Sequence, residues 1–373
     1  VLGDENTITT STSNIIINLN DLNDVNVVSF KGAVLHTTNG GNEVILVGNN
    51  MGPIDSGTTH VTVVSATFGL VGTEYTATNC RVTKQNTEVT CVVPEAGDPS
   101  KLSSVGLKWI LTVVSVDGVA KNHVTTSTAV TSYLPPVITA VTGADTLSTT
   151  GGENIVLTGT NFGDTSSSIY VSYGPIGMET MYAAKDCVVT VAHTEATCKS
   201  VEGYGKDMSF QITVLRQSSV LTLYSYGYGV PVITAVTGPT PGNTKVLNTK
   251  GGDIIIITGS NFGRKRSTTA PGSANGVQVP GSTFATLGRD DVAIFYGRTT
   301  GYENRMIFCD VVEHHIKMEC TTAPGVGINH KLLAAIGNQI SAVASELFNY
   351  KPPVLLTVTG PGSLDASTVG GQE

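Results

Sequence analysis

Six cysteines in three equally spaced pairs constrain the fold of this chain more than any other feature. In each pair the second cysteine follows the first by eleven positions; the pairs are Cys80 and Cys91, Cys187 and Cys198, and Cys309 and Cys320. The intervening segments, such as RVTKQNTEVT, consist of two short alternating stretches around a polar turn. A β-hairpin of this kind brings the cysteine Cα atoms within the roughly 4.4–6.8 Å that a disulfide needs. We therefore predict three disulfides, each closing one hairpin.

Zinc binding is the alternative use of paired cysteines. Zinc sites favour cysteines separated by about two to four residues, and two cysteines per repeat without a histidine common to all three leave a tetrahedral site incomplete. We therefore favour disulfides, which indicate an oxidising compartment and hence an extracellular, secreted or cell-surface protein.

The cysteine pairs belong to a repeat with a period of about 110 residues. Residues 135–163 read PPVITAVTGADTLSTTGGENIVLTGTNFG, residues 230–263 are a close copy, and residues 27–52 are a divergent one. Alternating Val, Ile and Thr around a Gly-Gly turn predict a strand, a turn and a second strand. Phe162 and Phe262, in the Gly-x-Asn-Phe-Gly turns, are expected to be buried. Short strands at regular spacing predict an all-β sandwich with negligible helix.

These residues resemble the IPT/TIG family of immunoglobulin-like domains. The resemblance rests on the opening P-x-[IV]-x-x-[IV]-x-[PG], the Gly-Gly-x-x-[IV]-x-[IV]-x-G strand, the G-x-[ND]-F-G turn, and paired cysteines ahead of a closing Tyr. The first copy departs from the pattern, because it lacks the Pro-Pro entry and has Met51 in place of the turn Phe. The resemblance implies tandem immunoglobulin-like β-sandwiches. It allows roles in surface receptors and adhesins, in accessory modules of polysaccharide enzymes, and in transcription factors.

The repeat divides the chain into units that follow one another without a spacer. We expect a closing strand of a preceding or partner repeat in 1–26, domains over 27–134, 135–229 and 230–351 with a loop insertion at 264–289, and an opening strand of a further repeat in 352–373. Prolines stand at each junction: Pro135, Pro136, Pro231, Pro352 and Pro353. Because proline fixes φ, the last strand of one domain runs into the next through a stiff joint. We predict a semi-rigid rod.

Both ends of the chain contain part of a further repeat. Residues 352–373 repeat the opening block, and Ser13 to Leu22 resemble a closing strand. One interpretation is a window from a longer repeat protein. The other is a strand donated to the next subunit, which would pair at a sheet edge and build a head-to-tail fibre.

Two polar segments are candidate sites. Glu313, His314 and His315 form the densest His and acid cluster, halfway between Cys309 and Cys320, where an exposed hairpin turn is favoured over a metal site. Arg264, Lys265 and Arg266 open the insertion, where a solvated loop is favoured over a contact site.

No catalytic motif of a known class is present, so we predict no enzyme activity, no catalytic residues, no cofactor and no metal.

Charge and aromatic content indicate which classes of partner the chain is not expected to bind. The net charge of −8 and a sequence pI near 5.4 argue against nucleic acid, and no apolar run reaches the length of a membrane helix. Glycan binding would need exposed aromatic rings, but the single tryptophan, Trp109, fits a sandwich core. Ser and Thr clusters are candidate sites for O-linked sugar: Thr125, Thr126, Ser127 and Thr128, and Ser267, Thr268 and Thr269.

A non-catalytic structural or adhesive protein fits these features best. We expect self-association into a surface fibre or filament through the incomplete terminal domains, or contacts with other cell-surface proteins and glycans. The alternatives are a stalk or ectodomain of a surface receptor or adhesin and, less favoured, a carbohydrate-binding accessory module.

Overall fold

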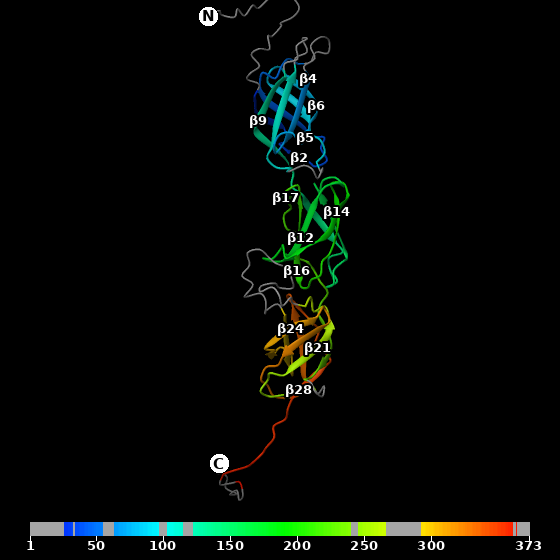
Figure 1. The fold of residues 1–373 in the computed structure, drawn as a ribbon, viewed down its shortest axis with the longest axis vertical. Helices are drawn as coiled ribbons and strands as arrows, with labels where there is room; N and C mark the ends of the chain where they lie inside the picture. The colour runs from blue at the N-terminus through cyan, green and yellow to red at the C-terminus, as the bar shows by residue number, and fades with distance from the viewer. Residues whose placement is uncertain are drawn as a thin grey trace, which may run out of the picture.

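Three β-sandwiches follow one another along a rod in the computed structural model, which describes residues 26–32, 34–54, 63–96, 103–114, 122–239, 245–265, 292–360 and 363 (Figure 1). Every regular element in these ranges is a strand, so the all-β prediction is confirmed. We call the sandwiches module 1, module 2 and module 3 in chain order. None of the described ranges holds a helix long and apolar enough to cross a membrane.

Module 1 contains two sheets. Its described strands are β1 (Asn26–Gly32), β2 (Leu35–His36), β3 (Glu43–Asn49), β4 (Val63–Gly69), β5 (Tyr75–Thr76), β6 (Thr78–Lys84), β7 (Glu88–Val92), β8 (Leu107–Val114) and β9 (Asn122–Tyr133). One sheet has the order β1-β3-β7-β6, and the facing sheet has the order β2-β9-β8-β4-β5.

Module 2 repeats this plan. Its strands are β10 (Val137–Thr142), β11 (Asn154–Thr160), β12 (Ile169–Pro175), β13 (Tyr182–Ala183), β14 (Lys185–Val191), β15 (Glu195–Lys199), β16 (Lys206–Val214), β17 (Gln217–Ser218) and β18 (Tyr226–Gly227). The sheets have the orders β10-β11-β15-β14 and β13-β12-β16-β17, with β18 also paired to β16.

Module 3 has the same arrangement. Its described strands are β19 (Val232–Thr237), β20 (Val246–Leu247), β21 (Ile254–Ser260), β22 (Val292–Gly297), β23 (Asn304–Arg305), β24 (Phe308–Glu313), β25 (Lys317–Thr321), β26 (His330–Ile336), β27 (Gln339–Ile340) and β28 (Leu347–Tyr350). The sheets have the orders β19-β21-β25-β24 and β20-β28-β26-β22-β23, with β27 paired to β26. Most of the insertion expected at 264–289 lies outside the described residues.

This order of strands is that of an immunoglobulin-like sandwich. In each module the first, second, fifth and fourth long strands form one sheet, and a short second strand or bridge joins the closing strand in parallel. The three disulfides link neighbouring strands within that first sheet: Cys80 to Cys91, Cys187 to Cys198, and Cys309 to Cys320. They therefore hold hairpins closed and do not bridge the two sheets as in antibody domains.

The sequence pattern explains the core. Along β11 the side chains of Ile155 and Leu157 are buried and alternate with outward residues, as a two-residue period requires. Phe162 and Phe262 are buried as predicted, and Met51 fills the same place in module 1. A Cβ on Gly159 would lie 1.9 Å from the carbonyl oxygen of Val137, so the glycine of this turn lets the first strand approach closely.

The tyrosine that closes each module is tied to the loop after the second cysteine. The hydroxyl of Tyr133 donates to the carbonyl of Pro94 at 2.9 Å, that of Tyr228 to Val201 at 2.7 Å, and that of Tyr350 to Ala323 at 2.8 Å. In all three modules the acceptor lies three residues after the second cysteine. This bond therefore fixes the loop after the second cysteine. The loop lies at the end of the sandwich from which the chain continues into the next residues of the rod.

Candidate functional site at the joints between modules

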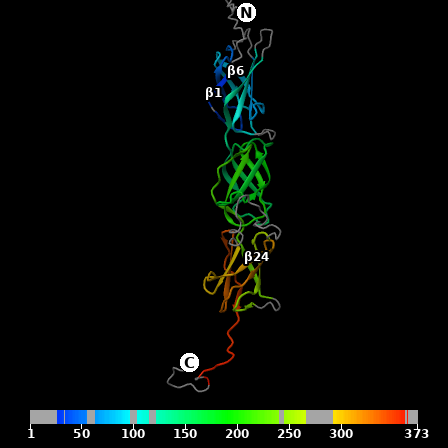
Figure 2. The ribbon, with the colours of Figure 1, turned by 60° about the vertical axis from the view of Figure 1, so that its left-hand side comes forward.

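Modules meet end to end, and each joint is built by turns of one module resting on the end of the preceding one (Figure 2). One turn is the tip of the disulfide hairpin, between β14 and β15 or between β24 and β25. The other follows the longest strand of the second sheet, between β16 and β17 or between β26 and β27. Since both turns recur in both joints, the joint is a repeated structure.

In the joint between modules 1 and 2, the hairpin tip places His193 against module 1. Its Nδ1 lies 2.9 Å from Oγ1 of Thr38, and its Nε2 lies 2.7 Å from Oε1 of Glu95. The backbone of His193, at the tip of the hairpin, has a φ of 64°. The backbone N–H of Thr38 donates to Oδ1 of Asn161 at 3.4 Å. Both Thr38 and His193 are buried in the joint.

The second turn of this joint bonds mainly to backbone groups. The backbone N–H of Ser104 donates to the carbonyl of Leu215 at 3.3 Å. The side-chain amide of Gln217 donates to the carbonyl of the closing Tyr133 at 2.8 Å and to Oγ of Ser104 at 2.7 Å. On the side of module 1 these contacts use backbone groups of Ser104 and Tyr133 and one side chain, the hydroxyl of Ser104, which also donates to the carbonyl of Leu215 at 3.2 Å.

The joint between modules 2 and 3 uses the same positions. The side-chain amide of Gln339 donates to the carbonyl of the closing Tyr228 at 2.6 Å, as Gln217 does one module earlier. Oγ1 of Thr149 donates to Oδ1 of Asn261 at 3.3 Å. The buried residues of modules 2 and 3 form one continuous cluster, whereas those of module 1 form their own.

Two glycines allow the backbones of modules 2 and 3 to touch. A Cβ on Gly337 would lie 2.6 Å from Cα of Gly205, and the N–H of Lys206 donates to the carbonyl of Gly337 at 3.2 Å. A side chain at either glycine would push the modules apart. This joint is therefore closed by direct main-chain contact.

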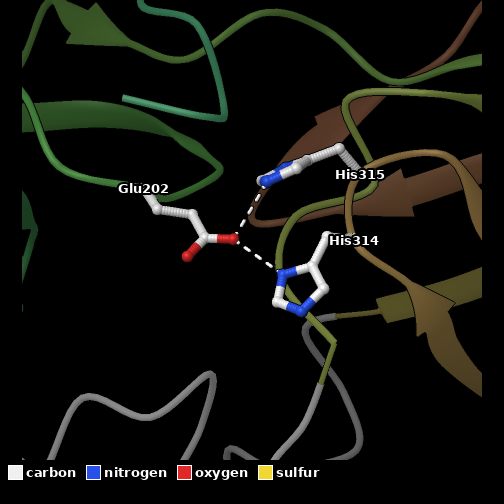
Figure 3. A group of neighbouring side chains, drawn as sticks. All are labelled: Glu202, His314 and His315. Atoms are coloured by element: carbon white, nitrogen blue, oxygen red, sulfur yellow. Dashed lines mark hydrogen bonds and ion pairs between the residues drawn. The ribbon is translucent and has the colours of Figure 1, made fainter. Parts of the chain in front are cut away.

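A cluster of titratable side chains lies in the same joint (Figure 3). Nδ1 of His314 and Nε2 of His315 each lie 2.9 Å from Oε1 of Glu202, which belongs to module 2. Nε of Arg264 lies 3.3 Å from Oε2 of the same carboxylate. The side chain of His315 is 12% exposed and that of His314 is 52% exposed. Burial lowers the pKa of His315 from 6.5, and the carboxylate of Glu202 opposes this shift.

The exposed hairpin turn expected at Glu313, His314 and His315 is confirmed as a turn between β24 and β25 but corrected in its exposure, because His315 is only 12% exposed against module 2. Glu313 points elsewhere and pairs with Lys317 at 3.4 Å, and Glu202 of the preceding module supplies the carboxylate. A signal for this existed in the sequence: Glu95 and Glu202 both lie four residues after the second cysteine, and His193 and His315 both lie five before it.

The remaining candidate residues lie in varied surroundings. The indole of Trp109 is buried, stacks on Phe68 with ring centroids 4.4 Å apart, and donates to Oγ1 of Thr131, so the core interpretation is confirmed. Ser127 is buried and its hydroxyl donates to the carbonyl of Ala129, which corrects its assignment as a glycan acceptor.

The other expected glycan sites and the joint prolines differ in exposure. Thr126 and Thr128 are exposed, whereas Thr125 is half-buried. Ser267, Thr268 and Thr269 lie outside the described residues, as do Arg266 and the segment Ser13 to Leu22. Among the prolines, the carbonyl of Pro135 accepts from the amide of Asn161, and Pro352 and Pro353 are exposed.

No protein-family model and no curated protein matches this sequence. Similar solved structures include a surface glycan-binding protein from Prevotella bryantii, 12% identical with a TM-score of 0.30, covering 69% of this chain and 60% of that one. The chicken CNTN1 FN1-FN3 domains are 12% identical with a TM-score of 0.22, covering 88% and 100%. The Escherichia coli adhesin FdeC is 9% identical with a TM-score of 0.23, covering 88% and 96%. Similarity at this level carries no conclusion about activity or ligands.

Proposed function

We propose that this protein is a non-catalytic extracellular rod of IPT/TIG-type modules, spanning 27–134, 135–229 and 230–351, that serves a structural or adhesive role. In this proposal the rod extends head to tail, because segment 352–373 supplies the first strand of a further sandwich in another subunit. The repeated joint is the observation that carries the proposal, since turns at corresponding positions hold each module on the one before it and share the bond from a glutamine amide to the closing tyrosine carbonyl.

The far end of module 3 has the features of a joint without a neighbour in the described residues. Thr38 and Thr149, the joint threonines of modules 1 and 2, are each 2% exposed, whereas Thr249 at the same position of module 3 is exposed. The carbonyl of Tyr350 corresponds to the joint acceptors of Tyr133 and Tyr228. Both features support the proposal that a further module docks at this end.

The segment that follows module 3 has the pattern of a core-facing strand. Val354, Leu355, Leu356 and Val358 are between 64% and 88% exposed. In module 3 the matching residues Ile233 and Val236 are buried, and they correspond to Leu355 and Val358. An exposed apolar strand is a template for pairing with another sheet. The three disulfides support an extracellular location.

Electron microscopy and light scattering of the purified full chain test this assembly. We expect filaments that are lost in Leu355→Asp/Val358→Asp, because a charge would face the core of the completed sandwich. The matched control is Leu356→Asp, which faces outward in the same strand and should leave filaments intact. Isolated rods from the unaltered chain at all concentrations would contradict self-assembly and favour a receptor or adhesin stalk.

A further inference from the structure

We propose that Glu202, His314 and His315 bind a zinc-like transition-metal ion that clamps module 2 to module 3. The inference does not depend on head-to-tail assembly, because both modules belong to one chain. It rests on three ligand-bearing side chains that come from two modules and converge in one joint (Figure 3).

The distances between the ligand atoms suit a tetrahedral ion. One oxygen of Glu202 lies 2.9 Å from a nitrogen of each imidazole, and all the ligand atoms lie within 4.8 Å of one another. Ligands at zinc bond lengths of about 2.0–2.2 Å lie roughly 3.3–3.6 Å apart in a tetrahedron, so small side-chain shifts admit the ion. The half-exposed position of His314 leaves the fourth coordination site to solvent.

The donor set selects the kind of metal. Two imidazoles and one carboxylate are a set that zinc uses with water as the fourth ligand. Imidazole also suits copper and nickel, whereas calcium and magnesium require mainly oxygen ligands. We therefore expect binding of Zn²⁺ and no binding of Ca²⁺ or Mg²⁺ at this site.

Local structure holds the two histidines in place. They form the tip of the hairpin closed by Cys309 and Cys320, and His315 has a φ of 65°. A rigid tip reduces the entropy lost when the ligands are ordered around an ion. Arg264 acts in the opposite direction, because its positive charge lies 3.3 Å from the second oxygen of Glu202 and weakens attraction for a cation.

The other joint provides an internal comparison. Glu95 and His193 occupy the positions of Glu202 and His315, but Ala192 stands where the second joint has His314. Nδ1 of His193 is also engaged with Thr38. The first joint therefore offers two ligands, one short of the set at the second joint.

Zinc titration by calorimetry tests the proposal on the full chain, prepared without a histidine tag, with its disulfides intact and treated with a chelator. We expect one Zn²⁺ per chain. His314→Ala and Glu202→Gln should each weaken binding by about tenfold or more, and Arg264→Gln should strengthen it. Ala192→His should raise the number of bound ions to two. The matched control is Glu313→Gln, adjacent to the ligands on the same turn, which should bind zinc unchanged.

Circular dichroism confirms that each variant is folded before its affinity is compared. Absence of saturable zinc binding by the unaltered chain overturns the proposal. So does binding that persists undiminished in folded His314→Ala, or that falls equally in Glu313→Gln. Competition by Ca²⁺ at similar concentration would also contradict the assigned donor set.

Discussion

Module 1 and module 2 share one strand order although their sequences have diverged, and two of their differences lie in the core. Opposite each other on neighbouring strands, module 1 has Phe68 and Trp109 where module 2 has Tyr173 and Phe210. Both pairs stack, with ring centroids 4.4 and 4.8 Å apart. The sandwich therefore accommodates different large aromatic residues at these two positions, while the bond from the closing tyrosine to the loop carbonyl is present in both modules.

A second difference lies in the short strand that runs parallel to the closing strand. His36 stands beside Tyr133 in module 1, where Leu147 stands beside Tyr228 in module 2. His36 is fully buried, and neither ring nitrogen has a hydrogen-bond partner among the described residues. Burial lowers the pKa of His36 to about 4. Module 1 therefore contains a group that opposes folding when it is protonated.

The largest expected effect tests a feature that the two modules share, the disulfide that closes the hairpin. Cys80→Ala/Cys91→Ala and Cys187→Ala/Cys198→Ala should each destabilise their own module by about 3 kcal/mol, because both disulfides close loops of equal length. Calorimetry measures each transition. Fluorescence of the single tryptophan identifies the transition of module 1. A loss confined to one of the two modules would show that the hairpins differ in their contribution.

The next effect is a difference between the modules in how their stability depends on pH. The unfolded chain binds a proton on His36 below about pH 6.5 and the folded chain only below about 4, so stability falls on acidification between these values. We expect His36 to cost module 1 about 2 kcal/mol at pH 5 relative to pH 7.5.

Denaturant titrations followed by Trp109 fluorescence measure this cost. His36→Leu should remove its share of the pH dependence. The reciprocal Leu147→His should introduce one in module 2, where calorimetry at the same pH values follows the transition. A wild-type and His36→Leu pair with identical slopes against pH would contradict this account.

The smallest effect concerns the hydroxyl that module 1 lacks. In module 2, Oη of Tyr173 lies 2.8 Å from Oη of Tyr228 and accepts from the N–H of Val201 at 3.0 Å. Tyr173→Phe should cost about 1 kcal/mol, because the partly buried N–H of Val201 loses its acceptor. The calorimetric midpoint of module 2 reports it. The control is Tyr224→Phe, whose hydroxyl donates to Glu179 near the surface and whose loss should have a smaller effect.

The elements that depend on local sequence were predictable. The hairpins between paired cysteines, the burial of Phe162 and Phe262 and the core position of Trp109 follow from spacing and alternation. These features involve residues close in the chain or a single side chain in a regular pattern, so each can be inferred without knowing how modules are oriented.

The joint cluster was not predictable in the same way. Glu202 and His315 are far apart in sequence, and their meeting depends on the angle between two modules. Glu313 is the carboxylate adjacent to the histidines in sequence, but its side chain pairs with Lys317. Neighbours along a hairpin turn point in different directions, so adjacency there is a weak guide to contact.

The acceptor shared by both joints is the backbone carbonyl of a closing tyrosine, Tyr133 in one and Tyr228 in the other. A carbonyl is present whatever the side chain, so this contact restricts the geometry of the joint more than its sequence. Repeating one such geometry applies the same rotation and translation at every step, which generates a helical path. Successive modules would then present their outer faces in a regular angular order around the axis.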